Sequence, residues 1–206
     1  MKIYRELEQG SQEWLDLRVG KITGSILKGV LQRDTTTLMQ TLLAEKLSGR
    51  AQDFFSSAAM QRGTETEPLA RRSYEDKTGR KVEEVGFIQN GRFSFVGFSP
   101  DGIISDPDKK YRRAVEIKCP ETKTHVKYIL NNSIPDEYDS QVLSYFYNMP
   151  DLQYLDFVSY DNRAVQKPIH IITVQRHMYE DQISRLNAEL PRFWARLTIE
   201  YNKLIF

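Results

Sequence analysis

Three charged residues in the middle of the chain have the types and spacing of a site that hydrolyses phosphodiesters. Asp101 stands in a Ser-Pro-Asp-Gly stretch, and Glu116 and Lys118 flank Ile117 in a later apolar stretch. If that stretch is a strand, Glu116 and Lys118 point to one face and Ile117 to the other, because side chains alternate along a strand. Carboxylates are hard ligands suited to Mg²⁺ or Mn²⁺, and the Ile117 carbonyl adds another oxygen. Such a site can activate water against a phosphodiester.

The path between the two carboxylates is short. The apolar run of residues 93–98 ends in the Asp-Gly turn, so a strand-turn-strand path places Asp101 beside Glu116. The alternative is an ordinary hairpin with a surface charge pair, because Asp-Gly is frequent in turns of any function. Other parts of the chain must decide between the two interpretations.

The composition is that of a globular protein. The chain has 206 residues, 40% hydrophobic and 28% charged, which predicts one domain over residues 1–206. No apolar run is long enough to cross a membrane and no signal peptide is recognisable, so we expect a cytoplasmic protein. The single cysteine, Cys119, fits a reducing compartment, and the three histidines lack zinc-ligand spacing.

The net charge of +1 gives no global signal for nucleic-acid binding. Basic residues are instead grouped locally, at 71–72, 80–81, 109–110 and 112–113. Each group is either a solvated face or a contact to DNA. A near-neutral protein that binds a duplex must concentrate positive potential where the duplex lies.

Hydrophobic periodicity and turn residues predict an α/β or α+β fold, with a central mixed sheet flanked by helices. We expect Val126, Ile129 and Leu130 to lie on one side of a helix, and a stripe of five apolar residues to bury the last one. The expected helices are residues 12–18, 23 or 24 to 30, 35–47, 56–62, 66–77, 122–131, 136–148 and 177–202. The expected strands are residues 82–89, 93–98, 102–105, 113–119, 152–159 and 169–174.

Two further positions allow a functional and a structural interpretation. Arg18 and Ser25 frame a helix start, where free N–H groups and a guanidinium can bind a phosphate; the alternative is a capped helix pair with a surface arginine. Glu67 directly precedes Pro68, where a carboxylate at a helix start is explained by capping alone. We expect the helical pattern to break or bend around Gly63 and Pro68.

Taken together, these motifs resemble the PD-(D/E)XK nuclease superfamily, and within it the YqaJ-type viral recombinases, the family of the phage lambda alkaline exonuclease. Four stretches occur in the family's order. They are residues 18–25, residues 63–68, residues 99–102 with 116–120, and residues 139–142.

The resemblance implies roles for single residues. Asp101, Glu116 and the Ile117 carbonyl would hold Mg²⁺, with Mn²⁺ as a substitute and two ions in all, and Glu67 would reach metal directly or through water. Lys118 would position and activate the attacking water, with an ammonium pKa lowered by nearby cations. Gln141 would orient the water and the scissile phosphate. Arg18, Ser25 and Ser99 would bind the 5′-phosphate, and Met60 would either separate the terminal bases as a wedge or pack in the core. The other implied DNA contacts are Arg33, and Lys123 or Thr124 on the downstream duplex.

The resemblance also implies an activity and partners. Family members digest one strand of linear duplex DNA from 5′ to 3′, release mononucleotides and leave 3′ overhangs for recombination with a single-strand annealing protein. A ring-shaped homotrimer and a phage or prophage origin in a bacterial host are implied with it. Two alternatives remain open, a structure-selective endonuclease on the same fold and a non-catalytic DNA-binding module. Clustered like charges at Asp101 and Glu116 argue against the binding module, because a structural role does not need them.

Overall fold

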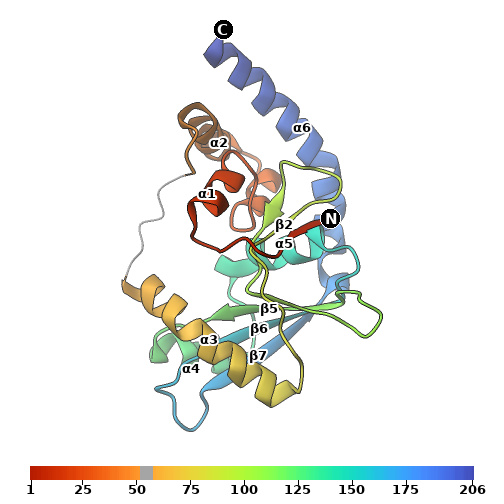
Figure 1. Cartoon of the computed structure of the whole chain (residues 1–206). Helices are drawn as coiled ribbons and strands as arrows, with labels where there is room; N and C mark the ends of the chain where they lie inside the picture. The colour runs from red at the N-terminus through yellow and green to blue at the C-terminus, as the bar shows by residue number, and fades with distance from the viewer. Residues whose placement is uncertain (52–57) are drawn as a thin grey trace.

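The computed structural model describes residues 1–51 and 58–206, without the side chains of 58–61. Its strands form two sheets, a small antiparallel one in the order β1-β2-β3 and a larger one in the order β4-β5-β6-β7 (Figure 1). The small sheet consists of β1 (Lys2–Tyr4), β2 (Phe87–Gln89) and β3 (Gly97–Phe98). The larger sheet consists of β4 (Gly102–Ile104), β5 (Arg113–Lys118), β6 (Tyr154–Tyr160) and β7 (Ile169–Gln175).

The larger sheet is mixed, as the sequence predicts. β5 pairs antiparallel with β4, where Gly102 lies opposite Val115, and parallel with β6, where Glu116 lies opposite Phe157. β7 then pairs antiparallel with β6. A parallel pair requires a long crossover, which here contains α4 (Thr122–Asn131), the 3₁₀ turn η2 (Asp136–Tyr138) and α5 (Asp139–Asn148). The predicted mixed α/β fold class is therefore confirmed.

Helices cover both faces of this sheet. On one face, α3 (Ala58–Thr78) packs Ala70 and Tyr74 against Val115 and Val158. On the other face, Tyr128 of α4 packs against the Phe157 ring, with the ring centroids 6.0 Å apart. The remaining helical elements are α1 (Gln12–Arg18), η1 (Leu27–Leu31), α2 (Thr36–Ser48), η3 (Arg176–Tyr179) and α6 (Glu180–Ile205).

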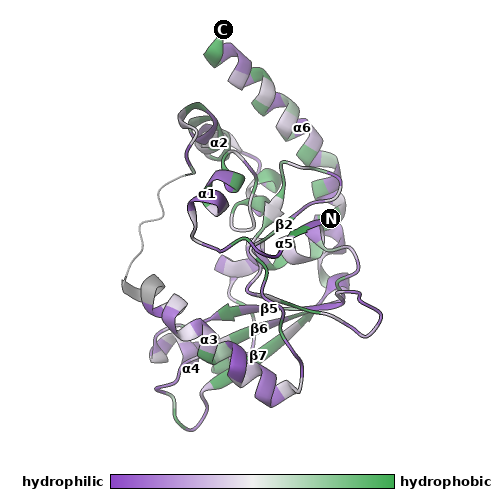
Figure 2. Cartoon of the chain, viewed as in Figure 1, coloured by the Kyte–Doolittle hydropathy of each residue, from purple (hydrophilic) through white to green (hydrophobic). Residues whose placement is uncertain are grey.

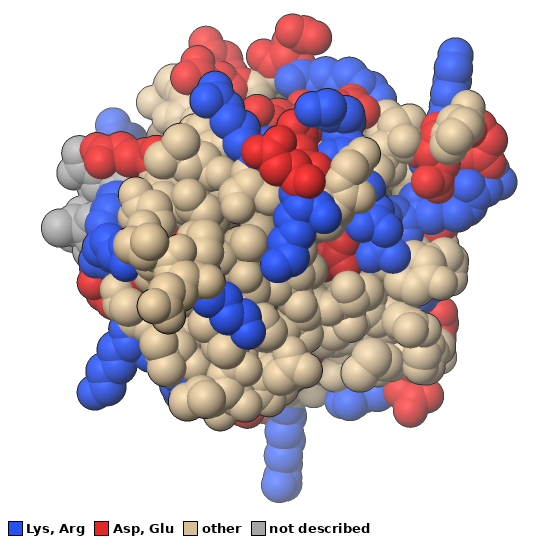
Figure 3. All heavy atoms as spheres, turned by 90° about the horizontal axis from the view of Figure 1, so that it is seen from below, with Lys and Arg blue, Asp and Glu red and all other residues tan. Residues whose placement is uncertain are grey.

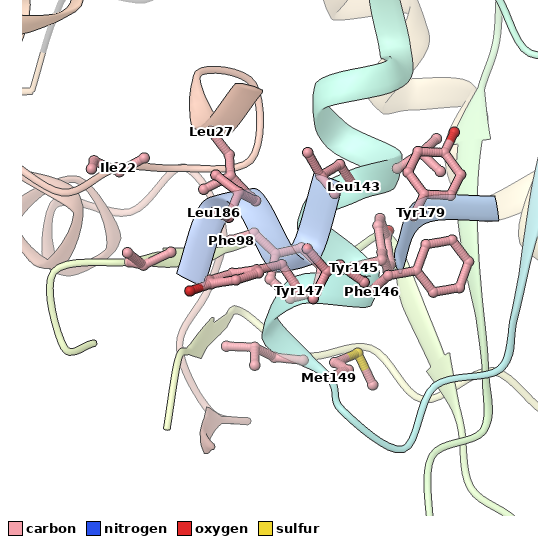
Figure 4. Packing of buried hydrophobic residues seen from close by; sticks show 14 of the residues in the cluster. Ile22, Leu27, Phe98, Leu143, Tyr145, Phe146, Tyr147, Met149, Tyr179 and Leu186 are labelled. Carbon is pink, nitrogen blue, oxygen red and sulfur yellow. The ribbon is translucent and has the colours of Figure 1, made fainter. Parts of the chain in front are cut away.

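The main hydrophobic core joins α5, α6 and η1 (Figure 4). Leu27, Leu143, Phe146 and Leu186 are all buried within it. The predicted stripe of α6 is confirmed, since its buried residues are Ile183, Leu186, Leu190, Phe193 and Leu197. Figure 2 shows that the strands of the larger sheet are mostly hydrophobic, whereas α6 alternates between hydrophobic and hydrophilic residues. No helix in residues 1–51 and 58–206 is both long and apolar enough to span a bilayer.

Three predicted elements are shorter than expected. Within residues 82–89 only Phe87–Gln89 forms a strand, and within residues 93–98 only Gly97–Phe98 does. The two segments pair with each other at only two positions, and outside these strands they make isolated bridges. The helix expected from residue 23 or 24 is the 3₁₀ turn Leu27–Leu31. Ser140 Oγ on α5 accepts a hydrogen bond from the Lys28 N–H, so tertiary contacts hold this segment out of α-helix geometry.

The predicted break of the helix around Gly63 and Pro68 is wrong. α3 continues through both residues, because the fully buried Ala70 and Tyr74 fix it on the sheet and outweigh local preference. Its expected start at residue 56 lies outside the described residues. In α4 the buried residues are His125 and Tyr128, whereas Val126 and Leu130 are exposed. His125 is buried because its ring nitrogens contact Ser159 Oγ at 2.7 Å and the Lys167 carbonyl at 2.9 Å.

Candidate active site

The start of β4 and the middle of β5 bring the three central residues together. The Asp101 carboxylate accepts a hydrogen bond of 2.7 Å from the Ile117 N–H. Lys118 Nζ lies 2.6 Å from Glu116 Oε1. As predicted, Glu116 and Lys118 share one face of the strand, while Ile117 packs with the residues under α3. Two carboxylates and one ammonium therefore form a compact, largely buried group.

Burial and like charge make this group electrostatically unfavourable without a further cation. Burial and the Glu116 carboxylate raise the Asp101 pKa well above its usual range. Burial would lower the Lys118 pKa, but the Glu116 and Asp101 carboxylates outweigh it, so the net shift is upward and Lys118 is an ammonium. Glu116 is only 1% exposed, and its Oε1 accepts no well-aligned hydrogen bond although the ammonium is close.

These donors fit a divalent cation. A cation between Asp101 and Glu116 would relieve the repulsion that raises the Asp101 pKa and would satisfy the buried Glu116 oxygen. Within residues 1–51 and 58–206, no group of three or more His, Cys, Asp or Glu is arranged as a metal site. Mg²⁺ does not require three such protein ligands, because it usually keeps several bound waters and is held by one or two carboxylates together with substrate oxygens.

Glu67 does not stand at a helix start, so its interpretation as a cap is wrong: it lies inside α3. Burial raises the pKa of the Glu67 carboxyl, although Arg71 Nη2 lies 2.6 Å from Glu67 Oε1. Arg71 Nη2 also donates to the Asp101 carbonyl at 3.2 Å. A cavity of about 370 Å³, which we call the Lys118 cavity, is lined by Glu67, Asp101 and Lys118. The structure therefore places a third carboxylate beside the central pair.

On the other side of Asp101 lies a cavity of about 210 Å³, which we call the Arg18 cavity. It brings together six of the predicted site residues from four separate stretches of the chain. Those residues are Arg18, Ser25, Ser99, Asp101, Glu116 and Gln141. The predicted phosphate pocket thus shares one cavity with two of the predicted metal ligands, Asp101 and Glu116.

Trp14 holds Arg18 in this cavity. The Arg18 guanidinium lies 3.9 Å from the centre of the Trp14 ring, and burial lowers the Arg18 pKa to about 10. Trp14 Nε1 donates to Ser99 Oγ at 2.8 Å, so the indole links the two predicted phosphate contacts. A half-buried guanidinium of this kind is suited to an anionic ligand.

The N-terminal turn of α5 fixes the loop that carries Ser25. Ser140 Oγ donates to the Gly24 carbonyl at 2.7 Å, and Asp139 forms an ion pair with Lys28. A Cβ on Gly24 would lie 2.8 Å from Ser144 Oγ, so only glycine allows the loop to approach the helix this closely. Gln141 on the same turn thereby faces Ser25 across the cavity.

We expect Gly24→Ala to displace this loop, lowering the free energy of unfolding by about 1–3 kcal/mol. Gly24→Ala combined with Ser144→Ala removes the hydroxyl that causes the clash and leaves contacts of 3.4 Å to Phe98 Cβ and 3.5 Å to the Cβ of residue 144, so stability should recover. Thermal unfolding of both variants checks this. Equal stability of the single variant and the unmodified protein would contradict it.

Sequence reasoning missed Tyr145, which connects the elements of the site. Its hydroxyl donates to the Val115 carbonyl at 2.8 Å and accepts from the Asp101 N–H at 3.0 Å. It also lies one helical turn after Gln141, which is the only sequence signal that points to it. Tyr145 therefore fixes the distance from Asp101 to β5. Arg71 and Trp14 were missed in the same way, although each lies four residues from a predicted site residue.

The remaining predicted DNA contacts lie elsewhere. Arg33, Lys123 and Thr124 line neither the Arg18 cavity nor the Lys118 cavity, so their roles stay predictions. The side chain of Met60 lies outside the described residues. Cys119 lines the Lys118 cavity as a free thiol, and burial raises its pKa to about 12, which makes it a weak nucleophile at neutral pH.

The mixed α/β fold with two sheets is the nuclease fold of the alkaline exonucleases to which this structure is similar. The model of the YqaJ-like viral recombinase domain matches residues 13–148, and the chain belongs to this family.

Solved structures agree with this assignment. The alkaline exonuclease LHK-Exo from Laribacter hongkongensis is 34% identical, with a TM-score of 0.82, and the match covers 94% of this chain and 96% of that one. A structure of LHK-Exo in complex with dAMP matches with a TM-score of 0.81 and the same identity and coverage. A phage-related exonuclease from Haemophilus somnus 129PT is 17% identical at a TM-score of 0.64, with 87% of this chain and 96% of that one covered, and shares the fold.

A curated viral protein is also related. The uncharacterized protein R354 of Acanthamoeba polyphaga mimivirus is 27% identical over 148 residues, which are 69% of this chain. The match spans only 26% of the viral protein's length.

Proposed function

We propose that this protein is a metal-dependent exonuclease that digests one strand of linear double-stranded DNA from 5′ to 3′. The observation that carries the proposal is the Arg18 cavity, in which Arg18, Ser25 and Ser99 lie in one space with Asp101 and Glu116. A phosphate held at Arg18 places the following phosphodiester beside the carboxylates. This arrangement favours cleavage of the phosphodiester next to the 5′ end of a strand.

The chain's own residues have separate tasks in this reaction. Asp101, Glu116 and the Ile117 carbonyl, with Glu67 nearby, would hold Mg²⁺, which would supply Lewis-acid stabilisation of the phosphate charge. The Lys118 ammonium donates hydrogen bonds that position the attacking water and offset negative charge developing on the phosphate. Gln141 orients the water and the scissile phosphate. Water attacks phosphorus, and the bond to the 3′-oxygen of the preceding nucleotide breaks.

The product of this reaction is a 5′-mononucleotide. The solved complex of LHK-Exo with dAMP supports this product class, because that relative binds a deoxynucleoside monophosphate and is 34% identical over 94% of this chain. The remaining strand carries a 3′ overhang. We place the protein in phage-type recombination beside a single-strand annealing protein, as a single nuclease domain that assembles into a homotrimer in the bacterial cytoplasm.

The decisive experiment compares two DNA forms in Mg²⁺. One is a linear duplex with a label at the 5′ end of one strand and the other end blocked; the second is a covalently closed circle. Early release of labelled mononucleotide with an intact circle is the expected result. A nicked circle, or long oligonucleotides before mononucleotides, would assign the site to an endonuclease. Intact linear duplex would overturn the proposal.

Arg18→Ala is expected to abolish the preference for 5′-phosphorylated over 5′-hydroxyl ends, because it removes the guanidinium that Trp14 holds in the cavity. The rate on phosphorylated ends should fall about a hundredfold, with little change on hydroxyl ends. Arg192→Ala is the matched control, since Arg192 is exposed on α6 and lines neither cavity. Equal rates of the unmodified protein on both ends would remove Arg18 from this role.

A further inference from the structure

The Lys118 cavity has a basic wall that the proposed reaction does not use. Arg62 on α3 lines this cavity together with Lys118 and Glu121. Its Nη2 donates to the Cys119 carbonyl at 2.7 Å, which fixes the guanidinium beside the end of β5. Its Nε is buried and makes no hydrogen bond of good geometry among the described residues, although it lies 3.3 Å from a Glu121 carboxylate oxygen. A buried donor of this kind is favourable only when an acceptor reaches it.

One carboxylate neutralises Arg62 and a second arginine together. Glu121 Oε1 lies 3.3 Å from Arg62 Nε, and Glu121 Oε2 lies 2.8 Å from Arg163 Nη1. Arg163, in the loop between β6 and β7, is itself fixed by Asp161, whose Oδ1 accepts from Arg163 Nε at 2.7 Å. Two arginines held in place by other groups therefore converge on one acidic side chain.

Glu121 has no structural task that would explain this position. It is the N-cap residue of α4, but its side chain makes no capping hydrogen bond. Its side chain is 61% exposed, so its ion pairs are screened by water and weak. A phosphate, which carries charge and accepts bidentate hydrogen bonds from arginine, binds such a pair better than an exposed carboxylate does. Figure 3, which shows the molecule from below, shows basic and acidic side chains next to one another in the upper part of the view.

We infer that Arg62 and Arg163 form a binding site for a DNA backbone phosphate next to the scissile one, and that Glu121 occupies this site until DNA displaces it. The inference rests on the proposed nuclease function, because it needs a DNA strand that passes Asp101 from the Arg18 cavity into the Lys118 cavity. Glu121 acts as a displaceable substitute for the phosphate and weakens binding to DNA.

The test is the affinity for a linear duplex in the presence of a chelator, measured by fluorescence anisotropy at several salt concentrations. Glu121→Gln should bind the duplex about tenfold more tightly at low salt. The slope of the logarithm of affinity against the logarithm of salt concentration should be steeper by about one released counterion. Glu189→Gln is the matched control, because it makes the same charge change at an exposed ion pair on α6. The control should change the affinity less than about twofold.

Two measurements separate this site from a general charge effect. Arg62→Gln added to Glu121→Gln should return the affinity to that of the unmodified protein. A duplex with one uncharged methylphosphonate, moved along the digested strand, should cancel the gain of Glu121→Gln at one position only. Unchanged affinity of a folded Glu121→Gln variant, or a gain equal to that of Glu189→Gln, would overturn the inference. Digestion by the unmodified protein in Mg²⁺ tests the proposed function separately, so the two can fail independently.

Discussion

Asp101→Asn is expected to lower the rate of DNA digestion by about a thousandfold or more, which corresponds to about 4 kcal/mol of lost transition-state stabilisation. Asparagine still accepts the hydrogen bond from the Ile117 N–H, so the turn before β4 keeps its geometry. What disappears is the charge that would hold a divalent cation beside Glu116. The loss should therefore appear in catalysis and in metal binding, with the fold intact.

The same variant should be at least as stable as the unmodified protein at neutral pH. The Asp101 pKa is raised on folding, so above the ordinary aspartate pKa of about 4 the unfolded chain is favoured by ionisation. Asparagine removes that penalty, and the advantage should vanish in acid, where the carboxyl is neutral in both states.

Thermal unfolding between pH 4 and pH 8 and a digestion assay in Mg²⁺ check both parts. Asp151→Asn, the same change at an exposed residue, is the control. Normal digestion by Asp101→Asn would refute the site.

Removing Lys118 alone should abolish digestion and also destabilise the protein. Lys118→Met leaves Glu116, 1% exposed, without its counter-charge, which costs about 3–5 kcal/mol in comparable buried pairs. The double variant Lys118→Met with Glu116→Gln removes both charges and keeps similar volumes. It should regain most of the stability and none of the activity.

Unfolding in urea and digestion of linear duplex separate these effects. Both variants should digest DNA at least about a hundredfold more slowly. Binding of duplex in a chelator should persist in the double variant, because the proposed phosphate contacts Arg18, Ser25 and Ser99 are unchanged. A folded Lys118→Met protein that digests at the normal rate would exclude the lysine from the mechanism.

The central residues could be predicted because their signal is local. Alternation along one strand puts Glu116 and Lys118 on one face, and a turn between neighbouring strands brings Asp101 next to them. The α6 stripe could be predicted for the same reason, since periodicity within one helix defines its buried side.

The features that could not be predicted depend on contacts between distant segments. Tyr145 bridges the Asp101 N–H and the Val115 carbonyl, a role that nothing in its neighbouring residues indicates. His125 replaces Val126 on the inner side of α4 because Ser159 and Lys167 satisfy its ring. Pro68 is tolerated in α3 because the helix packs against the sheet, and local helix propensity does not include this packing.

The parallel pairing of β5 with β6 has a consequence for how the protein matures. Glu116 lies opposite Phe157, so the strand that carries the charged group is completed only by a segment synthesised much later. Gln141 and Tyr145 belong to the intervening crossover and dock onto α6 through the main core. Contacts of such long sequence separation form late in folding. A nascent chain that lacks β6 and α6 thus carries every acidic residue of the site without an assembled site, and the site forms only once these later segments have folded onto it.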